Sequence, residues 1–525
     1  MKSFKFNIIL VLAGLIFFSS CKQKFEDYSR NNNLPLSVPP GVALRSVMGN
    51  LIVYPGGYED KADQYIVSNY TYYGDNKYWT GSAGLDYGTL NNVIAMEGLA
   101  RKANSGNDNN PYHALGLFFR AFFFVDMSEK VGDLPMTEAL QGISNITPKY
   151  DTQKDIFKQS LQWLDSANII LTGLLANGFL EFSGDFYFNP SDNSSSARAA
   201  LVHWQKVVNS YRLRILIELS KKADDPDLGV KQQFAAIVAD PTKYPIFTSN
   251  DDNLQYVYND KYNYYPDNTT NYGNNAGRLN VAATYLNTLS ALNDIRAMVI
   301  AEPARGLGFA DTDYRSFKGG GSGVDLGTLA TESGAKRLSL YNFNHYYSGY
   351  TAEPTLIVSY PEVCFAIAEG INRGWTTGSA DTWYQNGVKA SFEFYGIKDG
   401  ANTVTFRNDD GTANLTYSVT FNFSDYFNQS AVKYAGDNAT GLTQILTQKY
   451  LAYFRNSGLQ AYYQWRRTGV PVFDAGTGTG NGGVIPRRFQ YPSNEASVNT
   501  ANLDAAVQSQ YAGQDDINLD VWLVK

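Results

Sequence analysis

Residues 448–492 read QKYLAYFRNSGLQAYYQWRRTGVPVFDAGTGTGNGGVIPRRFQYP, and this stretch decides the fold. Tyr450, Leu451 and Phe454 are spaced so that they fall on one face of a helix. Gly458 can close that helix, because glycine adopts the left-handed conformation of a C-terminal cap without steric cost. The beginning of the stretch therefore predicts a helix that runs through Phe454 and ends at Gly458.

A second short helix is predicted directly after the first. Its apolar residues recur at steps of three, at Leu459, Tyr462 and Trp465. Gly469 and Pro471 end it. Arg466 and Arg467 lie in its last turn, where the helix dipole favours cations. From its residues alone, the stretch is a pair of packed helical segments with a buried tryptophan and no visible chemistry.

Composition limits the kind of ligand the chain can bind. Its 525 residues are 44% hydrophobic, and this length is enough for roughly three domains. A net charge of −7, without clustered Lys and Arg, argues against binding to a nucleic-acid backbone. Only 18% of the residues are charged, whereas 38 residues are tyrosine. The polar surface must therefore come from uncharged groups, which suit neutral polar ligands.

The N-terminus has the pattern of a targeting segment. Lys2 and Lys5 precede an apolar run, and small residues then lead to Cys21, as in a secretory signal over 1–20. This end resembles a bacterial lipobox, so we expect cleavage before Cys21 and lipidation of its thiol; an ordinary signal peptide with an incidental cysteine is the alternative. Residues 21–40 are then a lipidated tether. No run of 18 apolar residues follows, so the protein is predicted to be anchored to the membrane rather than to span it.

Hydrophobic periodicity predicts helices along most of the remaining chain. The pattern is clearest over 196–222, and 113–127 is apolar on nearly every side, which predicts full burial. Further helices are predicted over 87–104, 152–174 and 281–292, and another begins near Pro361. Residues 403–423 alternate as a short hairpin does. Long loops rich in Tyr, Asn and Gly lie between these elements.

The residues that catalysis or a cofactor would need are not found in a suitable pattern. Gly478, Gly480 and Gly483 match the pattern G-x-G-x-x-G. A dinucleotide site needs a helix to start directly after this pattern, but the residues that follow, Val-Ile-Pro at 484–486, cannot start one as required, so a loop is predicted. The histidines lack the spacing of a zinc site. Cys364 lies in an apolar helix and is predicted to be a small buried residue. We therefore expect a protein that is not an enzyme, with no catalytic residue, cofactor or metal.

Aromatic loops supply the positive signal. They cover 69–79, 256–272 and 341–350, where tyrosines alternate with Asn and Asp. A sugar ring offers one apolar face and a rim of hydroxyl groups. An aromatic ring can cover that face while Asn, Asp, Arg and tyrosine hydroxyls satisfy the rim. A peptide ligand could use the same groups.

Six residues of these loops, or next to them, are predicted to contact the ligand. Trp79 and Tyr73 are predicted to stack on it, and Arg337 is predicted to clamp a hydroxyl or carboxylate. The full set is Asn69, Tyr73, Asn76, Trp79, Arg337 and Tyr347. The alternative is that most tyrosines of the loops pack them onto the helices.

The stretch 448–492 and the residues after it resemble the C-terminal signature of the SusD/RagB family, and its second SusD-like subfamily in particular. Members of this family are surface nutrient-binding lipoproteins of Bacteroidetes. The matching residues are Gln448, Lys449, Asn456, Gly458, Leu459, Ala461, Trp465, Arg466, Arg467, Thr468, Gly469, Pro471, Ile485, Pro486, Arg487, Arg488, Tyr491, Pro492, Glu495, Asn499 and Asn502.

The resemblance covers nearly the whole chain after Cys21. It implies a mostly helical fold in which tetratricopeptide-like helix pairs support a loop-rich ligand-binding face, with one SusD-like domain over 41–525. It also implies an outer-membrane lipoprotein facing the cell exterior, which captures an oligosaccharide and caps a SusC-like TonB-dependent transporter. The first aromatic loop lies near the family's binding face.

Three other functions remain open from the sequence. Capture of a peptide, as in RagB-like relatives, would use the same loops. A glycoside hydrolase needs two carboxylates that the fold, not the spacing, brings together. A structural accessory protein would have no ligand.

Overall fold

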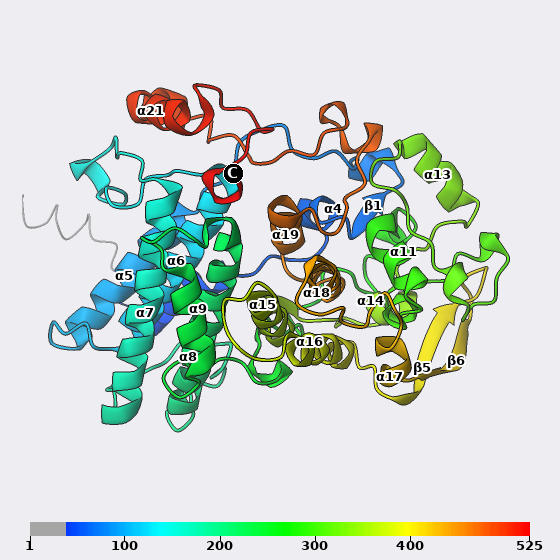
Figure 1. The fold of residues 1–525 in the computed structure, drawn as a ribbon, viewed down its shortest axis with the longest axis horizontal. Coiled ribbons are helices and arrows are strands. Elements are labelled where there is room, and N and C mark those ends of the chain that lie inside the picture. Colours follow the sequence, from blue (N-terminus) through cyan, green and yellow to red (C-terminus); the bar gives the residue numbers. More distant parts are fainter. Residues whose placement is uncertain (1–37) are drawn as a thin grey trace, which may run out of the picture.

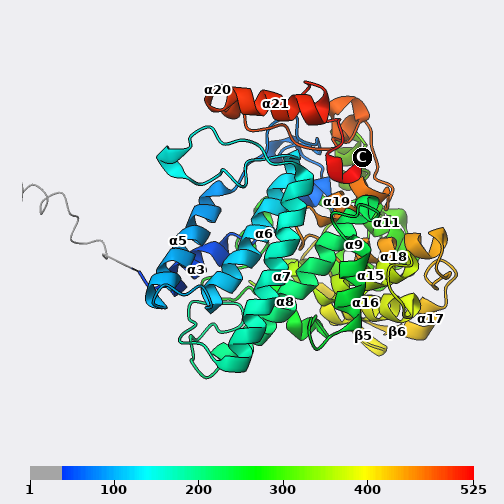
Figure 2. The same cartoon turned by 60° about the vertical axis from the view of Figure 1, so that its left-hand side comes forward.

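One side of the molecule is a layer of long helices. The computed structural model describes residues 38–525. Each helix from α5 onwards in this layer packs against the next along the chain, and Figure 2 shows α5 to α8 side by side. The layer consists of α3 (Pro40–Gly49), α5 (Tyr87–Ala103), α6 (Pro111–Val131), α7 (Gln153–Asn177), α8 (Ala197–Glu218) and α9 (Val230–Ala239).

Local sequence explains where these helices start and which sides they bury. Asn110 and Thr152 precede α6 and α7, and their side chains accept hydrogen bonds from backbone N–H groups of the first turn. Trp204 of α8 is fully buried, and its indole N–H donates to Asp185 at 2.9 Å. The helices predicted over 87–104, 113–127, 152–174 and 196–222 are thus confirmed, although α6 is longer than predicted.

A second group of helices joins this layer to the rest of the chain. Its members are α15 (Tyr360–Asn372), α16 (Ala380–Phe394) and α18 (Ala439–Leu451). Pro361 lies in the first turn of α15, and the Ser379 side chain accepts from a backbone N–H at the start of α16. Because α15 packs on α8, α16 and α18, it connects the helix layer with the loop-rich side (Figure 1).

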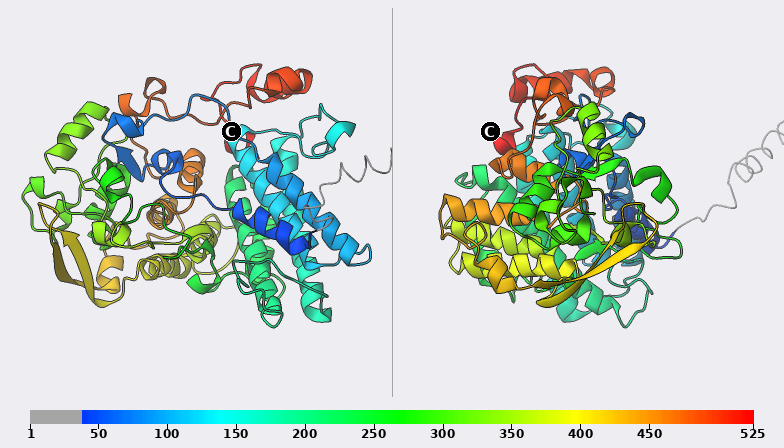
Figure 3. Two further views of the ribbon diagram at one scale, coloured as in Figure 1. Left: turned by 180° about the vertical axis from the view of Figure 1, so that it is seen from behind. Right: turned by 90° about the vertical axis from the view of Figure 1, so that its right-hand side faces the viewer.

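The far side of the molecule carries short strands and loops. The described residues form three two-stranded antiparallel sheets: β1 (Ile66–Ser68) with β3 (Leu279–Val281), β2 (Leu254–Tyr256) with β4 (Thr355–Val358), and β5 (Gly400–Arg407) with β6 (Asn414–Phe421). The sheet of β2 and β4 lies next to α8, where Arg214 donates to the Ile357 carbonyl. The pair of β5 and β6 confirms the predicted hairpin. Figure 3 shows this hairpin, in yellow, at the edge remote from the long blue and cyan helices.

Shorter helices complete the fold. The predicted helix over 281–292 forms as α11. The short helices are α4 (Tyr58–Ala62), α10 (Tyr272–Asn275), α11 (Ala283–Ala291), α12 (Arg296–Ile300), α13 (Leu326–Gly334), α14 (Phe343–Tyr346), α17 (Phe423–Phe427), α19 (Gln460–Thr468), α20 (Glu495–Val498) and α21 (Thr500–Tyr511).

The first helix of the deciding stretch ends earlier than predicted. The helix α18 stops at Leu451, and the chain continues to Gly458 as a loop, so the predicted extension through Phe454 is wrong. Arg455 has a φ of 59°, which is incompatible with a continuing right-handed helix. Its guanidinium lies between Asp60 at 3.0 Å and Asp267 at 2.7 Å. These partners come from distant segments, so the local pattern did not reveal them.

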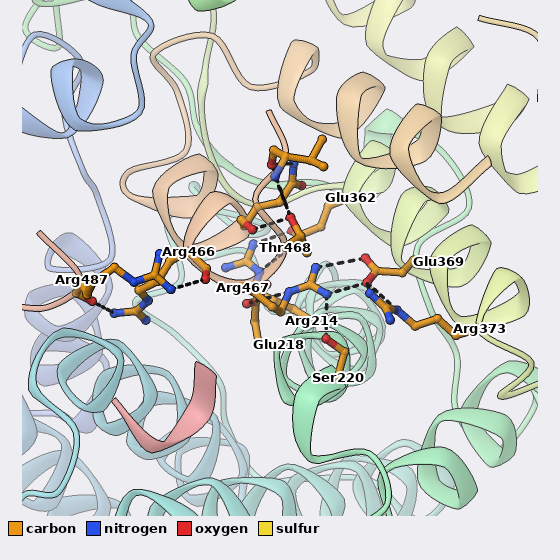
Figure 4. Close-up of polar contacts among 12 residues, drawn as sticks. Arg214, Glu218, Ser220, Glu362, Glu369, Arg373, Arg466, Arg467, Thr468 and Arg487 are labelled. Carbon is orange, nitrogen blue, oxygen red and sulfur yellow. Dashed lines mark hydrogen bonds and ion pairs between the residues drawn. The ribbon is translucent and has the colours of Figure 1, made fainter. Parts of the chain in front are cut away.

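The second helix of the stretch is α19, and it is fixed by buried ion pairs. Arg467 pairs with Glu369 of α15 at 2.5 Å and with Glu218 of α8 at 3.4 Å (Figure 4). Arg467 and Glu369 each have a side chain only 1% exposed. Arg466 instead donates to the backbone carbonyls of Glu129 and Arg487. The two arginines at the end of α19 therefore meet partners from four other segments of the chain, in addition to the helix dipole.

The described residues bear on only part of the membrane prediction. In residues 38–525 no helix combines the length and the apolar character needed to cross a bilayer. Cys21, the signal segment 1–20 and most of the tether 21–40 lie outside the described residues. Cys364 is fully buried and unpaired, as predicted.

Candidate functional site

A cleft of about 400 Å³ lies on the loop-rich side of the molecule. Its walls come from α10, α13, α14, the loop after α12, and the turn between β5 and β6. These elements belong to four separate parts of the chain. The lining residues are Tyr272, Gly273, Ala276, Gly277, Glu302, Pro303, Ala304, Arg305, Ser333, Lys336, Leu338, Leu340, Tyr341, Phe343, Arg407, Asn408, Asp409, Asp410 and Gly411.

Glu302 holds two of these walls together. One oxygen of its carboxylate accepts the backbone N–H of Phe343 at 2.9 Å, and the other accepts that of Arg407 at 3.0 Å. The first bond fixes the start of α14 and the second fixes the end of β5. Burial raises the pKa of Glu302 to about 7, although these two hydrogen bonds act in the opposite direction. The Glu302 carboxyl group therefore connects α14 to β5 and has a structural role at the base of the cleft.

Aromatic rings form the next part of the cleft. Tyr272 and Phe343 meet edge to face, with ring centroids 4.6 Å apart. Tyr347 supports Tyr272 from behind at 5.3 Å. The Arg407 guanidinium lies over the Phe343 ring, 3.8 Å from its centroid, and 5.6 Å from that of Tyr272. The cleft thus offers ring surface beside a cation.

Polar groups surround this aromatic centre. Arg305 makes two hydrogen bonds of 2.9 Å to Asp311. Lys336 reaches across to Asp409 of the hairpin turn at 3.5 Å. A ligand ring can pack against Tyr272 while its polar rim meets these groups, which is the combination that carbohydrate recognition requires. Within residues 38–525, no His, Cys, Asp and Glu side chains gather in a group of three that could hold a metal ion.

Two predicted site residues of the first loop are used by the fold. Asn69 is buried and donates to Asn280 at 2.7 Å and to Ser333 at 2.8 Å, so it lies directly behind the cleft wall that Ser333 helps to line. Asn76 is also buried and exchanges two hydrogen bonds with the backbone of Ser68. Direct contact with a ligand would require either amide to leave these partners.

Trp79 lies apart from the lining of the cleft. The Trp79 ring stacks on Phe489 at 3.9 Å, and its indole N–H donates to the Arg488 carbonyl at 2.8 Å. One face of the indole is therefore already covered. Tyr73 belongs to a short 3₁₀ turn, Thr71–Tyr73.

Arg337 and Tyr347 lie beside the cleft without lining it. Arg337 pairs with Glu332 at 2.5 Å, and its chain neighbours Lys336 and Leu338 are both lining residues. Tyr347 is buried behind Tyr272. The structure thus brings Asn69, Arg337 and Tyr347 close to one cleft, whereas Asn76 and Trp79 serve other parts of the fold. Ligand contact by the predicted residues stays a prediction.

The sequence did not identify Glu302 or Arg407 as site residues. Tyr272 and Phe343 belong to the second and third predicted aromatic loops, so the loop pattern was a valid signal for them. Arg407 ends a predicted hairpin strand, but nothing nearby in the sequence indicates which aromatic rings it will meet. Burial of Tyr341, Tyr346 and Tyr347 agrees with the alternative that many loop tyrosines pack onto the helices.

Comparisons with known proteins agree with this fold. A family model described as "Starch-binding associating with outer membrane" matches residues 48–492. Two SusD homologues from Bacteroides fragilis are 26% and 27% identical, each covering 93% of this chain and 100% of its own, with TM-scores of 0.79 and 0.74. A chitin-binding SusD homologue from Flavobacterium johnsoniae is similar in fold, at 19% identity, 93% and 98% coverage, and a TM-score of 0.68. A search of curated proteins gave no match.

Proposed function

This chain belongs to the SusD-like family of starch-binding proteins that associate with the outer membrane, and we propose that it captures an oligosaccharide at the cell surface and passes it to a SusC-like TonB-dependent transporter. Capture requires no bond breaking, so the protein holds its ligand rather than acting on it. The chitin-binding homologue is a relative in fold whose ligand is a polysaccharide. Nutrient capture is the activity that the family and the cleft support together.

The observation that carries this proposal is the composition of the cleft. Tyr272 presents ring surface, and hydrogen-bonding side chains of Ser333, Lys336, Asn408 and Asp410 surround it. A sugar needs both features at once, because its ring has apolar C–H groups on one face and hydroxyl groups around the edge.

Peptide capture is the alternative that uses the same transport system. A peptide is commonly held by adding a strand to an exposed sheet edge. Here the end of β5 already uses its outer edge: Glu302 accepts the Arg407 N–H, and Asn344 donates to the Thr405 carbonyl at 3.3 Å. The cleft therefore favours an oligosaccharide over an extended peptide.

Replacing Tyr272 with Ala is expected to weaken oligosaccharide binding by roughly tenfold, since truncating a central aromatic contact costs more than about 1 kcal/mol. Isothermal titration calorimetry against a panel of neutral and acidic oligosaccharides measures the affinity of the wild type and of Y272A. Titration of W79A with the same panel tests whether Trp79 of the first aromatic loop contacts the ligand.

The two variants distinguish two positions for the ligand. Loss of affinity in Y272A with an unchanged W79A places the ligand in the cleft. The reverse result places it on the first aromatic loop, as the sequence predicted. Binding of peptides but of no saccharide would contradict the proposed ligand class.

Replacing Cys21 with Ala is expected to move the protein from the membrane fraction to the soluble fraction, because the lipid attached to the thiol is the proposed anchor. Cell fractionation followed by immunoblotting measures the distribution. Replacing the buried Cys364 with Ser is the matched control and should leave the protein in membranes.

Retention of C21A in the membrane would overturn the lipid anchor. Membranes of the wild type also test the delivery step. Co-purification of a large β-barrel protein with the anchored chain supports the proposed transporter, whereas its isolation as a single species favours a stand-alone role.

A further inference from the structure

Nearly every charged side chain that lines the cleft already has a partner within the protein. Arg305 is paired with Asp311, and Lys336 with Asp409. Asp410 accepts the backbone N–H of Thr412 at 3.0 Å and its hydroxyl at 2.5 Å. Glu302 accepts two backbone N–H groups. These groups are satisfied before a ligand arrives.

Arg407 is different from the other charged residues of the lining. Among the described residues, none accepts a hydrogen bond from its guanidinium or forms an ion pair with it. Its Nε is buried and has no hydrogen-bond partner. A guanidinium carries five N–H donors, and a buried donor without an acceptor costs free energy. The cleft therefore contains a cation for which the described part of the chain supplies no anion.

The surrounding groups hold this cation in place without neutralising it. Its backbone N–H donates to Glu302, and its guanidinium lies over the Phe343 ring, with Tyr272 next to it. An aromatic face attracts a cation through its quadrupole but offers no acceptor to the in-plane N–H groups. Nε is buried, so the terminal N–H groups of the guanidinium are the donors left for a ligand, and both contacts set their position.

We propose that Arg407 receives a ring carboxylate of the ligand, so that the oligosaccharide captured in this cleft contains uronic acid. A carboxylate accepts two parallel hydrogen bonds from a guanidinium, which fixes the orientation of the sugar as well as binding it. The sugar ring then lies next to Tyr272. This inference rests on the proposed capture of an oligosaccharide and adds the chemical class of its sugar.

The acidic residues of the cleft do not oppose this assignment. Asp409 faces Lys336, and the hydrogen bonds of Asp410 are made within its own turn. Glu302 is turned toward two backbone N–H groups at the base, and burial raises its pKa, so its negative charge is reduced near neutral pH. Arg305 adds a further positive charge to the same wall, although Asp311 balances it.

Calorimetric titration of the full-length protein tests the assignment. The probes are tetramers of galacturonic, glucuronic and mannuronic acid, each with its methyl ester, which keeps the ring but removes the charge. The wild type is expected to bind at least one acid at least roughly tenfold more tightly than its ester, because a hydrogen bond to a charged group contributes about 1.5–3 kcal/mol. In R407Q this preference should disappear.

Arg315 provides a matched control elsewhere on the surface. It also lies over a phenylalanine ring, at 4.4 Å from the centroid of Phe309, but it is paired with Asp313 and does not line the cleft. R315Q should keep the full preference for the acid. Thermal melting of both variants checks that each remains folded.

The outcomes distinguish the assignment of Arg407 from the proposed capture of an oligosaccharide. Equal binding of acid and ester, or a preference that survives in R407Q, overturns the assignment of Arg407. Binding of neutral oligosaccharides alone overturns the uronate assignment and leaves oligosaccharide capture standing. Binding of peptides but of no saccharide overturns both. Loss of the preference in R407Q alone supports the assignment.

Discussion

Replacing Arg467 with Met is expected to destabilise the protein by about 3–5 kcal/mol, the usual cost of removing one partner from a buried ion pair. Arg467 is the common partner of Glu369 and Glu218, whose side chains are 1% and 5% exposed. Methionine fills similar space but leaves both carboxylates short of a counter-charge. Arg373 also pairs with Glu369, at 2.8 Å, so part of the charge balance survives there.

Urea unfolding followed by circular dichroism measures the loss. Replacing the exposed Arg101, which pairs with Asp108 at 2.6 Å, is the control and should cost about 0.2–1 kcal/mol. An equal effect of the two substitutions would contradict the importance of the buried network.

The same network makes stability depend on pH. Burial alone would raise the pKa of Glu369, but the charges of Arg467, Arg373 and Lys449 outweigh it and lower the pKa to about 2. A carboxyl group with a lowered pKa stabilises the folded state at pH values above its ordinary pKa of 4.5. This stabilisation is lost as the pH falls from 4.5 through about 2. The difference in stability between wild type and R467M should therefore narrow below about pH 4.5.

Replacing Arg455 with Met is expected to destabilise the protein by a similar amount, about 3–5 kcal/mol. Arg455 serves two carboxylates, Asp60 and Asp267, and the side chains of all three are at most 6% exposed. Burial raises the pKa of Asp60 to about 6 even with the arginine present. Without Arg455, the Gly56 backbone hydrogen bond is left to oppose burial, so the pKa of Asp60 should rise further and acidic pH should restore part of the stability of R455M.

Neutralising the two carboxylates tests this explanation. The triple variant R455M/D60N/D267N removes all three charges and should recover part of the stability lost in R455M, because no buried ion is left unpaired. Urea unfolding of wild type, single and triple variants gives the comparison. A triple variant less stable than R455M would show that the charges themselves are not the cause.

The helical part of the fold could be predicted because its signals are local. Caps such as Asn110 and Thr152, and apolar spacings of three and four, lie within each helix. The end of α18 could not be predicted in this way. Its position depends on Arg455 meeting Asp60 and Asp267, which lie far from it in the sequence.

The candidate site was predictable only as a set of loops. Segments of all three aromatic loops do approach one cleft: Asn69 bonds to Ser333 behind its wall, Tyr272 lines it, and Phe343 packs against Tyr272. Which loop side chains turn inward was not predictable, because composition does not reveal the partners of Asn76 or Trp79. Arg407 comes from the hairpin, outside the aromatic loops.

The hairpin of β5 and β6 is joined to no other sheet among the described residues, because its strands pair only with each other, from Gly400 with Phe421 to Arg407 with Asn414. Its length and its turn can therefore vary without shifting the register of any other strand. Exchanging this one unit would replace Arg407 and the turn that borders the cleft, while the helix layer stays as it is. Relatives that diverge here can acquire new ligands on an unchanged scaffold, and a designer can follow the same route.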